Sequence, residues 1–344
     1  YKSLVDLKII EPNPFSVFVG PNGAGKSNIF EALEFLTLSN TVDGDNVLTM
    51  FGGISNIYSK THTEKHKNIN FELILDDKHK RKIDINVESS SGDVSYIGGG
   101  RTLIGRYLLD WFEKNDSTTS SKVKEQWKDA LTNASGKQFF DSYSRLFVNN
   151  IKIVKQQSNQ DIKLSSDCSN LEKVLKRILK DKNKREDIVD WLDLLVPGFE
   201  NIDIVSEPLS GTDSLVIYEK GTNKPFTKNL LSDGTYNILS LLTAVYQSDE
   251  PQFLCIEEPE NGLNPKVQKE LVNLFRQKCE DEGHYIWINT HSQTIVNQLE
   301  AKELIIVDKI AGATQIKQLT DFDTSGLPMD EAWLTNTLGG GLPW

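Results

Sequence analysis

The sequence predicts an α/β fold built on a parallel sheet, and two observations lead to this class. Short apolar runs alternate with helical patterns near both ends of the chain. In the C-terminal part, Phe253–Ile256 is apolar at every position, as in strands that are buried on both faces of a sheet. Strands that alternate with helices in this way are typical of parallel sheets with crossover helices.

The composition limits the classes of protein. The 344 residues fit one large domain or two, and 38% hydrophobic residues fit a globular chain. The formal net charge of −11 excludes a general coat for nucleic acid, so a DNA contact needs a local basic patch. Three cysteines without a Cys-x-x-Cys pair form neither a disulfide framework nor a zinc site of that kind, so we expect a cytoplasmic protein. No apolar run reaches the roughly 20 residues of a membrane span.

The N-terminal part predicts a strand, a loop, a helix and a hairpin. Phe15–Val19 is rich in β-forming residues, and a helical pattern covers Asn28–Leu38 after a glycine-rich loop. Two alternating runs, Ile69–Leu75 and Lys82–Val87, flank a polar segment, which indicates an antiparallel β-hairpin.

After the N-terminal part, the sequence pattern becomes mainly helical and then alternates between strand and helix again. Helical patterns over Arg106–Trp127 and Leu171–Trp191 predict a helical insertion, and Leu215–Lys224 predicts a hairpin. Further helices are expected over 236–246, 266–279 and 294–299, and further strands over 253–256, 284–289 and 304–307. We therefore expect an N-terminal lobe at 1–100, a helical insertion at 101–200 and a C-terminal lobe at 201–344.

The strongest motif is Gly20-x-x-x-x-Gly25-Lys26-Ser27, which matches the phosphate-binding pattern G-x-x-x-x-G-K-[ST]. Its glycines let successive backbone N–H groups face one anion, and the following helix directs its positive end at the phosphates. Lys26 can reach the β and γ phosphates, and the Ser27 hydroxyl can ligate Mg²⁺. The alternative is a plain glycine-rich turn, but the position between a predicted strand and helix favours phosphate binding.

Two carboxylates follow the apolar strand at 253–256. Glu257 at this place would help to hold Mg²⁺, and Glu258 would polarise the attacking water. The alternative is a pair of solvated carboxylates at the end of a strand.

Two further segments fit the same chemistry. Ser232 and Gly234 open a predicted helix and would form a second anion-binding helix N-terminus, although Ser232 is equally a common N-cap. His291 directly follows a predicted strand and would sense the γ phosphate, although a lone histidine is more often structural.

These four motifs, in this order, resemble those of ABC-type ATPases of the RecF, SMC and OLD group, and within it the compact OLD-like AAA family of bacteria. The resemblance covers about 1–60 and 225–344. It implies a P-loop NTPase fold, namely an ABC-ATPase head with an antiparallel β subdomain and a helical insertion. The nucleotide-binding residues that it implies are Asn22, Gly23, Ala24, Gly25, Lys26, Ser27 and Asn28, with Ser232 and Gly234.

The resemblance also implies a mechanism. Two heads would sandwich MgATP, with Ser232 of one chain closing over ATP bound at Lys26 of the other, in a homodimer or a larger assembly. Glu258 and His291 would be catalytic, and Ser27 and Glu257 would hold Mg²⁺. Hydrolysis would switch a separately encoded effector, by first choice a nuclease, in bacterial anti-phage defence. Glu257 and Asn264 differ from the Asp and His that relatives often carry there.

Three alternatives remain open at this stage. One is a RecF-like clamp on DNA, another is the nucleotide-binding subunit of a transporter, and the third is a scaffold that binds ATP without turnover. The basic face of the helix from Leu171 is either solvated or a nucleic-acid or partner contact. His62 and His66 lack the spacing of a metalloprotease helix and predict a solvated loop.

Overall fold

The computed structural model describes most of the N-terminal and C-terminal parts of the chain and short stretches between them: residues 1–42, 44–57, 68–74, 80–87, 94–97, 142–148, 162–206, 213–222, 224–319 and 326–338. The chain divides into two compact units. Unit 1 comprises Tyr1–Lys8, Ser27–Tyr143 and Lys309–Gln315. Unit 2 comprises Ile9–Lys26, Ser144–Asp308 and Ile316–Trp344.

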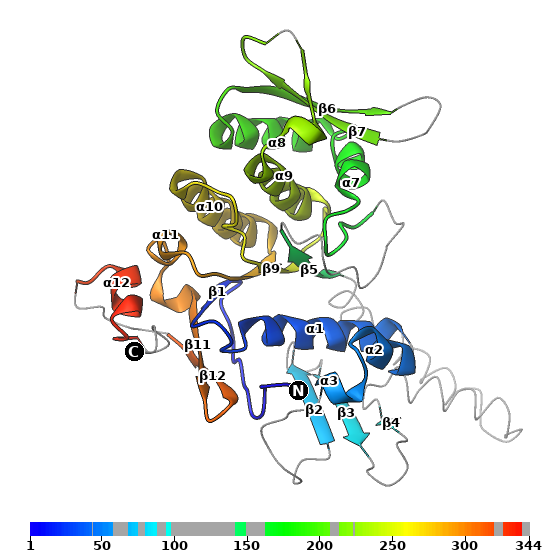
Figure 1. Cartoon of the computed structure of the whole chain (residues 1–344), viewed down its shortest axis with the longest axis vertical. Coiled ribbons are helices and arrows are strands. Elements are labelled where there is room, and N and C mark those ends of the chain that lie inside the picture. Colours follow the sequence, from blue (N-terminus) through cyan, green and yellow to red (C-terminus); the bar gives the residue numbers. More distant parts are fainter. Residues whose placement is uncertain are drawn as a thin grey trace, which may run out of the picture. The chain divides into compact units, whose positions relative to one another are not determined.

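A six-stranded sheet has the order β12-β11-β1-β10-β9-β5 (Figure 1), and most of its residues belong to unit 2. Its strands are β1 (Phe15–Val19), β5 (Tyr143–Phe147), β9 (Phe253–Glu257), β10 (Tyr285–Asn289), β11 (Leu304–Ile310) and β12 (Ala313–Gln318). Strand β1 pairs in parallel with β10 and β11, and β10 pairs in parallel with β9. The parallel sheet predicted from the alternating pattern is therefore confirmed, and it places the carboxyl ends of β1, β9 and β10 at one edge.

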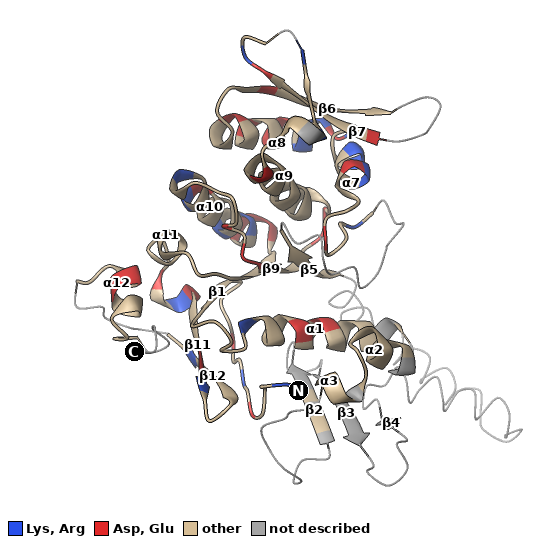
Figure 2. Ribbon diagram, in the orientation of Figure 1, with Lys and Arg blue, Asp and Glu red and all other residues tan. Residues whose placement is uncertain are grey.

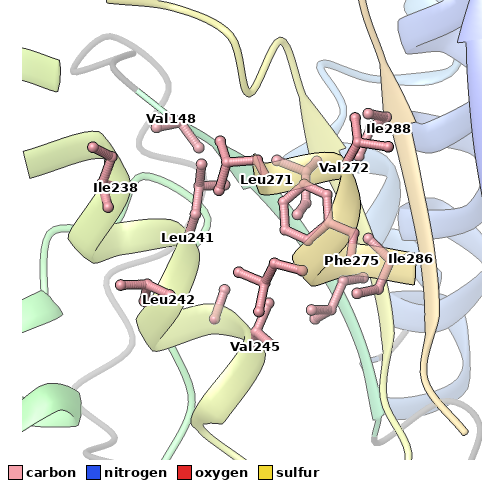
Figure 3. Packing of buried hydrophobic residues seen from close by; sticks show 14 of the residues in the cluster. Val148, Ile238, Leu241, Leu242, Val245, Leu271, Val272, Phe275, Ile286 and Ile288 are labelled. Atoms are coloured by element: carbon pink, nitrogen blue, oxygen red, sulfur yellow. The ribbon is translucent and has the colours of Figure 1, made fainter. Parts of the chain in front are cut away.

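Helices pack on this sheet through a continuous apolar core. The helices of unit 2 are α7 (Leu171–Ile178), α8 (Lys182–Leu195), α9 (Asp233–Tyr246), α10 (Pro265–Glu282), α11 (Gln293–Val296) and α12 (Met329–Leu334), with 3-10 turns η1 (Lys228–Leu230) and η2 (Ala301–Glu303). Figure 3 shows Leu241 and Val245 of α9 turned toward Leu271 and Phe275 of α10. The Phe275 ring lies 6.2 Å from the ring of Phe15 on β1, so α10 packs directly against the strand that precedes the glycine-rich loop.

A small antiparallel sheet follows α8 in the chain and packs against α7 and α8 in unit 2. It consists of β6 (Phe199–Ser206), β7 (Asp213–Glu219) and β8 (Phe226–Thr227). The pairing of β7 with β8 confirms a hairpin in the predicted region, with the second strand slightly later than expected. Strand β6 was not expected, and its partly exposed pattern explains why the sequence signal is weak.

The stretch expected to be a helical insertion is not helical throughout. Strand β5, at residues 143–147, is part of the six-stranded sheet rather than of an insertion. The single helix expected from Leu171 to Trp191 is two helices, because Asp181 caps the second one by accepting hydrogen bonds from the N–H groups of Asn183 and Lys184. The expected helix at 106–127, and His62 and His66, lie outside the described residues.

Unit 1 combines helices with an antiparallel sheet. It contains α1 (Lys26–Thr41) except for its first residue, α2 (Gly44–Met50), α3 (Ile54–Ile57), and the sheet of β2 (Asn68–Ile74), β3 (Lys80–Val87) and β4 (Val94–Ile97). The register of β2 and β3 confirms the predicted hairpin. Phe35 and Phe51 pack edge to face at 5.2 Å in the core of this unit. Across the described ranges of both units, no helix is long and apolar enough to cross a membrane.

Candidate functional site

The glycine-rich loop connects β1 to α1, and its glycines are required by its geometry. A Cβ at Gly20 would lie 1.9 Å from the carbonyl oxygen of Val307 on β11. Gly23 and Gly25 have φ values of 77° and 109°, in the region that side chains other than hydrogen disfavour. Between them Ala24 is buried, whereas Asn22 is exposed. The loop therefore takes the tight curve that phosphate binding needs.

Lys26, the first residue of α1, has its ammonium folded over this loop. Its Nζ donates hydrogen bonds to the carbonyl oxygens of Gly20 at 2.7 Å and Pro21 at 3.2 Å. Burial lowers the pKa of Lys26 to about 8, although the charges of Glu258, Glu257 and Glu260 oppose this shift. The loop thus holds a poorly hydrated cation, which an incoming anion would stabilise.

Glu257 ends β9 as a buried carboxylate with specific partners. Arg145 on β5 donates to Glu257 Oε1 from Nε at 2.9 Å and from Nη2 at 2.6 Å. Asn289, the last residue of β10, donates from Nδ2 to Glu257 Oε2. The carboxylate is therefore shared by three neighbouring strands of the sheet.

Glu258 is exposed and lies in an unusual backbone conformation. Its φ is 46°, in the left-handed region, and its N–H contacts Asn289 through the backbone oxygen at 3.1 Å and Oδ1 at 2.9 Å. Asn261 donates from Nδ2 to Glu258 Oε2 at 3.2 Å. A strained residue that its neighbours hold in place is a common feature of functional sites.

Glu260 connects the turn after β9 to the loop after β10. Its Oε1 accepts a hydrogen bond from the backbone N–H of His291 at 2.8 Å, and burial raises the pKa of the Glu260 carboxyl. Burial lowers the pKa of His291, and the positive charge of Lys26 adds to this effect, whereas Glu258 opposes it. Lys26, Glu258 and His291 are thus electrostatic neighbours, which brings together three of the residues singled out in the sequence.

The segment at Ser232 has a structural role within the chain. Ser232 is exposed, and its Oγ caps α9 by accepting the N–H of Thr235 at 3.2 Å. A Cβ at Gly234 would lie 2.5 Å from the carbonyl oxygen of Gly262. The start of α9 therefore packs tightly on the turn that follows the two carboxylates.

Ser27 and Asn28 belong to unit 1. Asn28 Nδ2 donates to Ser3 Oγ at 2.8 Å, and Ser3 Oγ in turn contacts Thr314 Oγ1 at 2.6 Å. Asn28 thus has a structural contact within unit 1 besides the nucleotide-binding role expected of it.

Sequence reasoning missed Arg145, Asn289 and the contact of Glu260 with His291. Asn289 carries a signal, because it is the polar residue that ends a strand immediately before Thr290 and His291. Arg145 carries none, because it lies in a region expected to be helical, and only the pairing of β5 in the sheet brings it to Glu257.

The residues present fit a nucleotide with Mg²⁺. A glycine loop at a helix N-terminus offers N–H groups and a cation to phosphate oxygens. Mg²⁺ in nucleotide sites is usually held by one or two protein oxygens together with phosphates, and within unit 2 the Glu257 carboxylate is an oxygen ligand of this kind.

The chain also matches known proteins. Residues 15–297 match the model of the family described as "AAA domain, putative AbiEii toxin, Type IV TA system". No curated protein sequence matches the chain.

Two crystal structures of SMC heads are similar in fold. A head bound to the C-winged helix domain of ScpA shares 17% identity and a TM-score of 0.56, over 93% of this chain and 95% of that chain. A head with an extended coiled coil bound to the C-terminal domain of ScpA, from Pyrococcus furiosus, shares 13% identity and a TM-score of 0.50, over 93% and 94%. The α/β fold of a P-loop ATPase head that the sequence predicts is thereby confirmed.

Proposed function

The chain belongs to this AAA domain family, and from that premise we propose that it binds MgATP and hydrolyses the bond between the β and γ phosphates. The observation that carries the proposal is the position of Lys26. Its partly desolvated ammonium lies in a glycine loop at the carboxyl end of β1, within electrostatic range of Glu257 and Glu258 at the end of β9. A fixed cation beside two carboxylates is the arrangement that phosphoryl transfer requires.

Each residue has a proposed role. The backbone of the loop from Gly20, together with Lys26, binds the phosphates, and Ser27 and Glu257 hold Mg²⁺, which offsets phosphate charge when bound. Glu258, the exposed carboxylate, accepts a proton from the attacking water, as a general base must be able to reach solvent and substrate. His291, whose charged neighbours are Lys26 and Glu258, senses the γ phosphate.

We further propose that two copies close around the nucleotide. The exposed N-terminus of α9, with Ser232 and Gly234, offers N–H groups to a phosphate bound in the other copy. Because Gly234 packs on Gly262, a change in the turn that follows Glu258 would move the N-terminus of α9 and so affect its contact with the other copy.

A partner protein that is switched by this cycle is the finer part of the proposal. The family description names a toxin of a type IV TA system, and the two SMC heads are bound to domains of ScpA. Both observations support a head that acts through another protein, and an effector nuclease in anti-phage defence remains our first choice.

The basic residues of α7 and α8 bear on the DNA-binding alternative. Figure 2 shows basic and acidic residues together on these helices. Several of the basic side chains have internal partners: Lys176 pairs with Asp213 at 2.7 Å, and Arg177 donates to the carbonyl oxygen of Gln247 at 2.6 Å. These contacts favour the interpretation of the basic run as a structural face.

Calorimetric titration with ATP and Mg²⁺ tests the proposed function. The parent protein should bind ATP, and Lys26→Ala should bind it about 100-fold more weakly, because a charged hydrogen-bond donor to phosphate is lost. Glu258→Gln should still bind but hydrolyse ATP at least about 100-fold more slowly. Lys278→Ala is the control, since Lys278 is also a buried lysine but pairs with Glu282 on α10. Equal affinity of the parent and Lys26→Ala would refute the phosphate-binding role of the loop.

A further inference from the structure

A chain of buried polar groups crosses three adjacent strands at the proposed site. Arg145 lies on β5, Glu257 on β9 and Asn289 on β10, and these strands are neighbours in the sheet. The side chains of Arg145 and Glu257 are 4% and 7% exposed, and two hydrogen bonds of 2.9 and 2.6 Å join them. Removing one member of a buried ion pair costs stability, because the charge of the other member then stays buried without a partner.

The guanidinium of Arg145 is held from a second side. Its central carbon lies 4.6 Å from the centroid of the Phe147 ring, which fixes the plane of the fork. A lysine has no such planar fork and contacts a carboxylate as a point charge. The orientation of Glu257 therefore depends on arginine in particular, and not on positive charge alone.

The orientation of Glu257 in turn fixes Asn289. Because Glu257 Oε2 only accepts hydrogen bonds, the Asn289 amide must present its nitrogen to it. The amide oxygen of Asn289 then faces the N–H of Glu258, at 2.9 Å. The chain of groups thus ends on the backbone of the residue whose left-handed conformation sets the direction of its side chain.

We propose that Arg145 is a positioning residue of the nucleotide site, which orients the Glu257 carboxylate directly and the Glu258 backbone through Asn289. This inference rests on the proposed function. It makes Arg145 necessary for the metal-dependent part of nucleotide binding, although phosphate binding by the Lys26 loop is independent of it. The structure supplies a matched comparison, because Arg276 forms a similar pair with Glu303, with Nε and Nη2 distances of 2.7 and 2.8 Å, between α10 and η2.

The test compares Arg145→Lys with Arg276→Lys, using Mn²⁺ and a non-hydrolysable ATP analogue. Titration followed by electron paramagnetic resonance measures free Mn²⁺, and calorimetry in EDTA measures binding of the analogue without metal. In Arg145→Lys we expect Mn²⁺ binding in the presence of the analogue to weaken about 10- to 100-fold, as for other residues that orient a metal ligand. Affinity for the analogue in EDTA should stay within about twofold, since the phosphate loop is intact. Arg276→Lys should leave both constants within about twofold of the parent.

The outcomes separate the two proposals. A parent protein that fails to bind the analogue refutes the proposed function itself. If the parent binds but Arg145→Lys takes up Mn²⁺ as well as the parent does, the positioning role is wrong. Tighter Mn²⁺ binding would also overturn it, because Arg145 would then compete with the metal for Glu257.

A second variant covers the case in which Arg145→Lys does not fold. Asn289→Ala interrupts the same chain of groups between Glu257 and the Glu258 backbone without removing a charge. It should weaken Mn²⁺ binding and keep binding of the analogue in EDTA. Unchanged Mn²⁺ binding in a folded Asn289→Ala protein would contradict the inference in the same way.

Discussion

Glu258, the proposed general base, has a strained backbone conformation, with a φ of 46°. A residue other than glycine in the left-handed region costs about 1–2 kcal/mol. Both contacts of its N–H come from Asn289, and Asn261 donates to its carbonyl oxygen and to its side chain, so two neighbours hold the strained conformation. If Glu258 has the proposed role, the site keeps this conformation at a cost in stability.

Replacing Glu258 by glycine and by alanine isolates that strain. Glycine adopts a φ of 46° without a steric penalty, so Glu258→Gly should be more stable to urea than Glu258→Ala by about 1 kcal/mol. Lys269, exposed in the middle of α10, is the control, since alanine there should be more stable than glycine by about 1 kcal/mol. Equal stability of the two Glu258 variants would show that the conformation is not strained.

His284 predicts a dependence of stability on pH. Its side chain is buried, and burial lowers its pKa, although the charge of Glu282 opposes the shift. The folded protein therefore keeps this histidine neutral at a pH where the unfolded chain, with a histidine pKa of about 6.5, takes up a proton. The stability that the neutral, buried His284 permits is fully present above about pH 6.5. It is lost as the pH falls below that value, because the unfolded chain then gains a proton that the folded protein does not. Between pH 7.5 and 5.5, the unfolding temperature should decrease less for His284→Gln than for the parent. Identical decreases would show that His284 does not cause this pH dependence.

The single residues that the sequence reveals are those in local motifs. Lys26 and Glu258 stand at fixed spacings within strand–loop–helix patterns, so one chain segment contains their whole signal. Arg145 and Glu257 are more than 100 positions apart, and their pairing exists only because β5 is a neighbour of β9 in the sheet. No local pattern encodes such a contact.

Among the elements, the N-terminus of α9 shows how close packing joins two motifs. Asn237 of α9 donates from Nδ2 to the carbonyl oxygen of Asn261 at 2.7 Å, and Gly234 approaches Gly262 nearby. The helix start and the turn that follows Glu258 therefore behave as one packed element.

Gly234→Ala tests this packing. Alanine would raise the helix propensity of α9 by about 1 kcal/mol, but its Cβ would meet a backbone carbonyl at 2.5 Å. We expect the steric effect to prevail and the free energy of unfolding to fall by about 1–3 kcal/mol. Asp233→Ala, at the exposed first position of the helix, should change it by less than about 1 kcal/mol. A Gly234→Ala protein more stable than the parent would show that propensity prevails.

The strands of the main sheet that carry the motifs follow from local patterns, whereas several other elements do not. The bounds of β1 agree with prediction to the residue, and β9 and β10 differ by one residue at an end, because their apolar runs are unambiguous. The elements that were not predicted are β4, β5, β6, β12, α2, α3 and α12. Strands β5 and β6 contain charged or exposed positions that resemble loop, and only their pairing in a sheet makes them strands.

For the molecule as a whole, the proposed function requires two copies. Light scattering of Glu258→Gln should show twice the monomer mass with ATP and Mg²⁺ and the monomer mass without ATP, because slow hydrolysis preserves the closed state. Lys26→Ala should show no increase in mass, and Ser232→Arg should bind ATP without the increase, since it obstructs the exposed helix start. The same mass with and without ATP would exclude the two-copy model.

The sequence by itself determined the class of fold, because strand and helix patterns alternate along the chain. It also determined the glycine-loop motif with Lys26 and the pair of carboxylates at 257 and 258, because each lies within one continuous segment. Only the tertiary structure decided that β5 joins the main sheet, that Arg145 and Asn289 hold Glu257, and that Gly234 packs on Gly262. These contacts join segments far apart in the chain, and their energies depend on burial and register, which arise only when the sheet has formed.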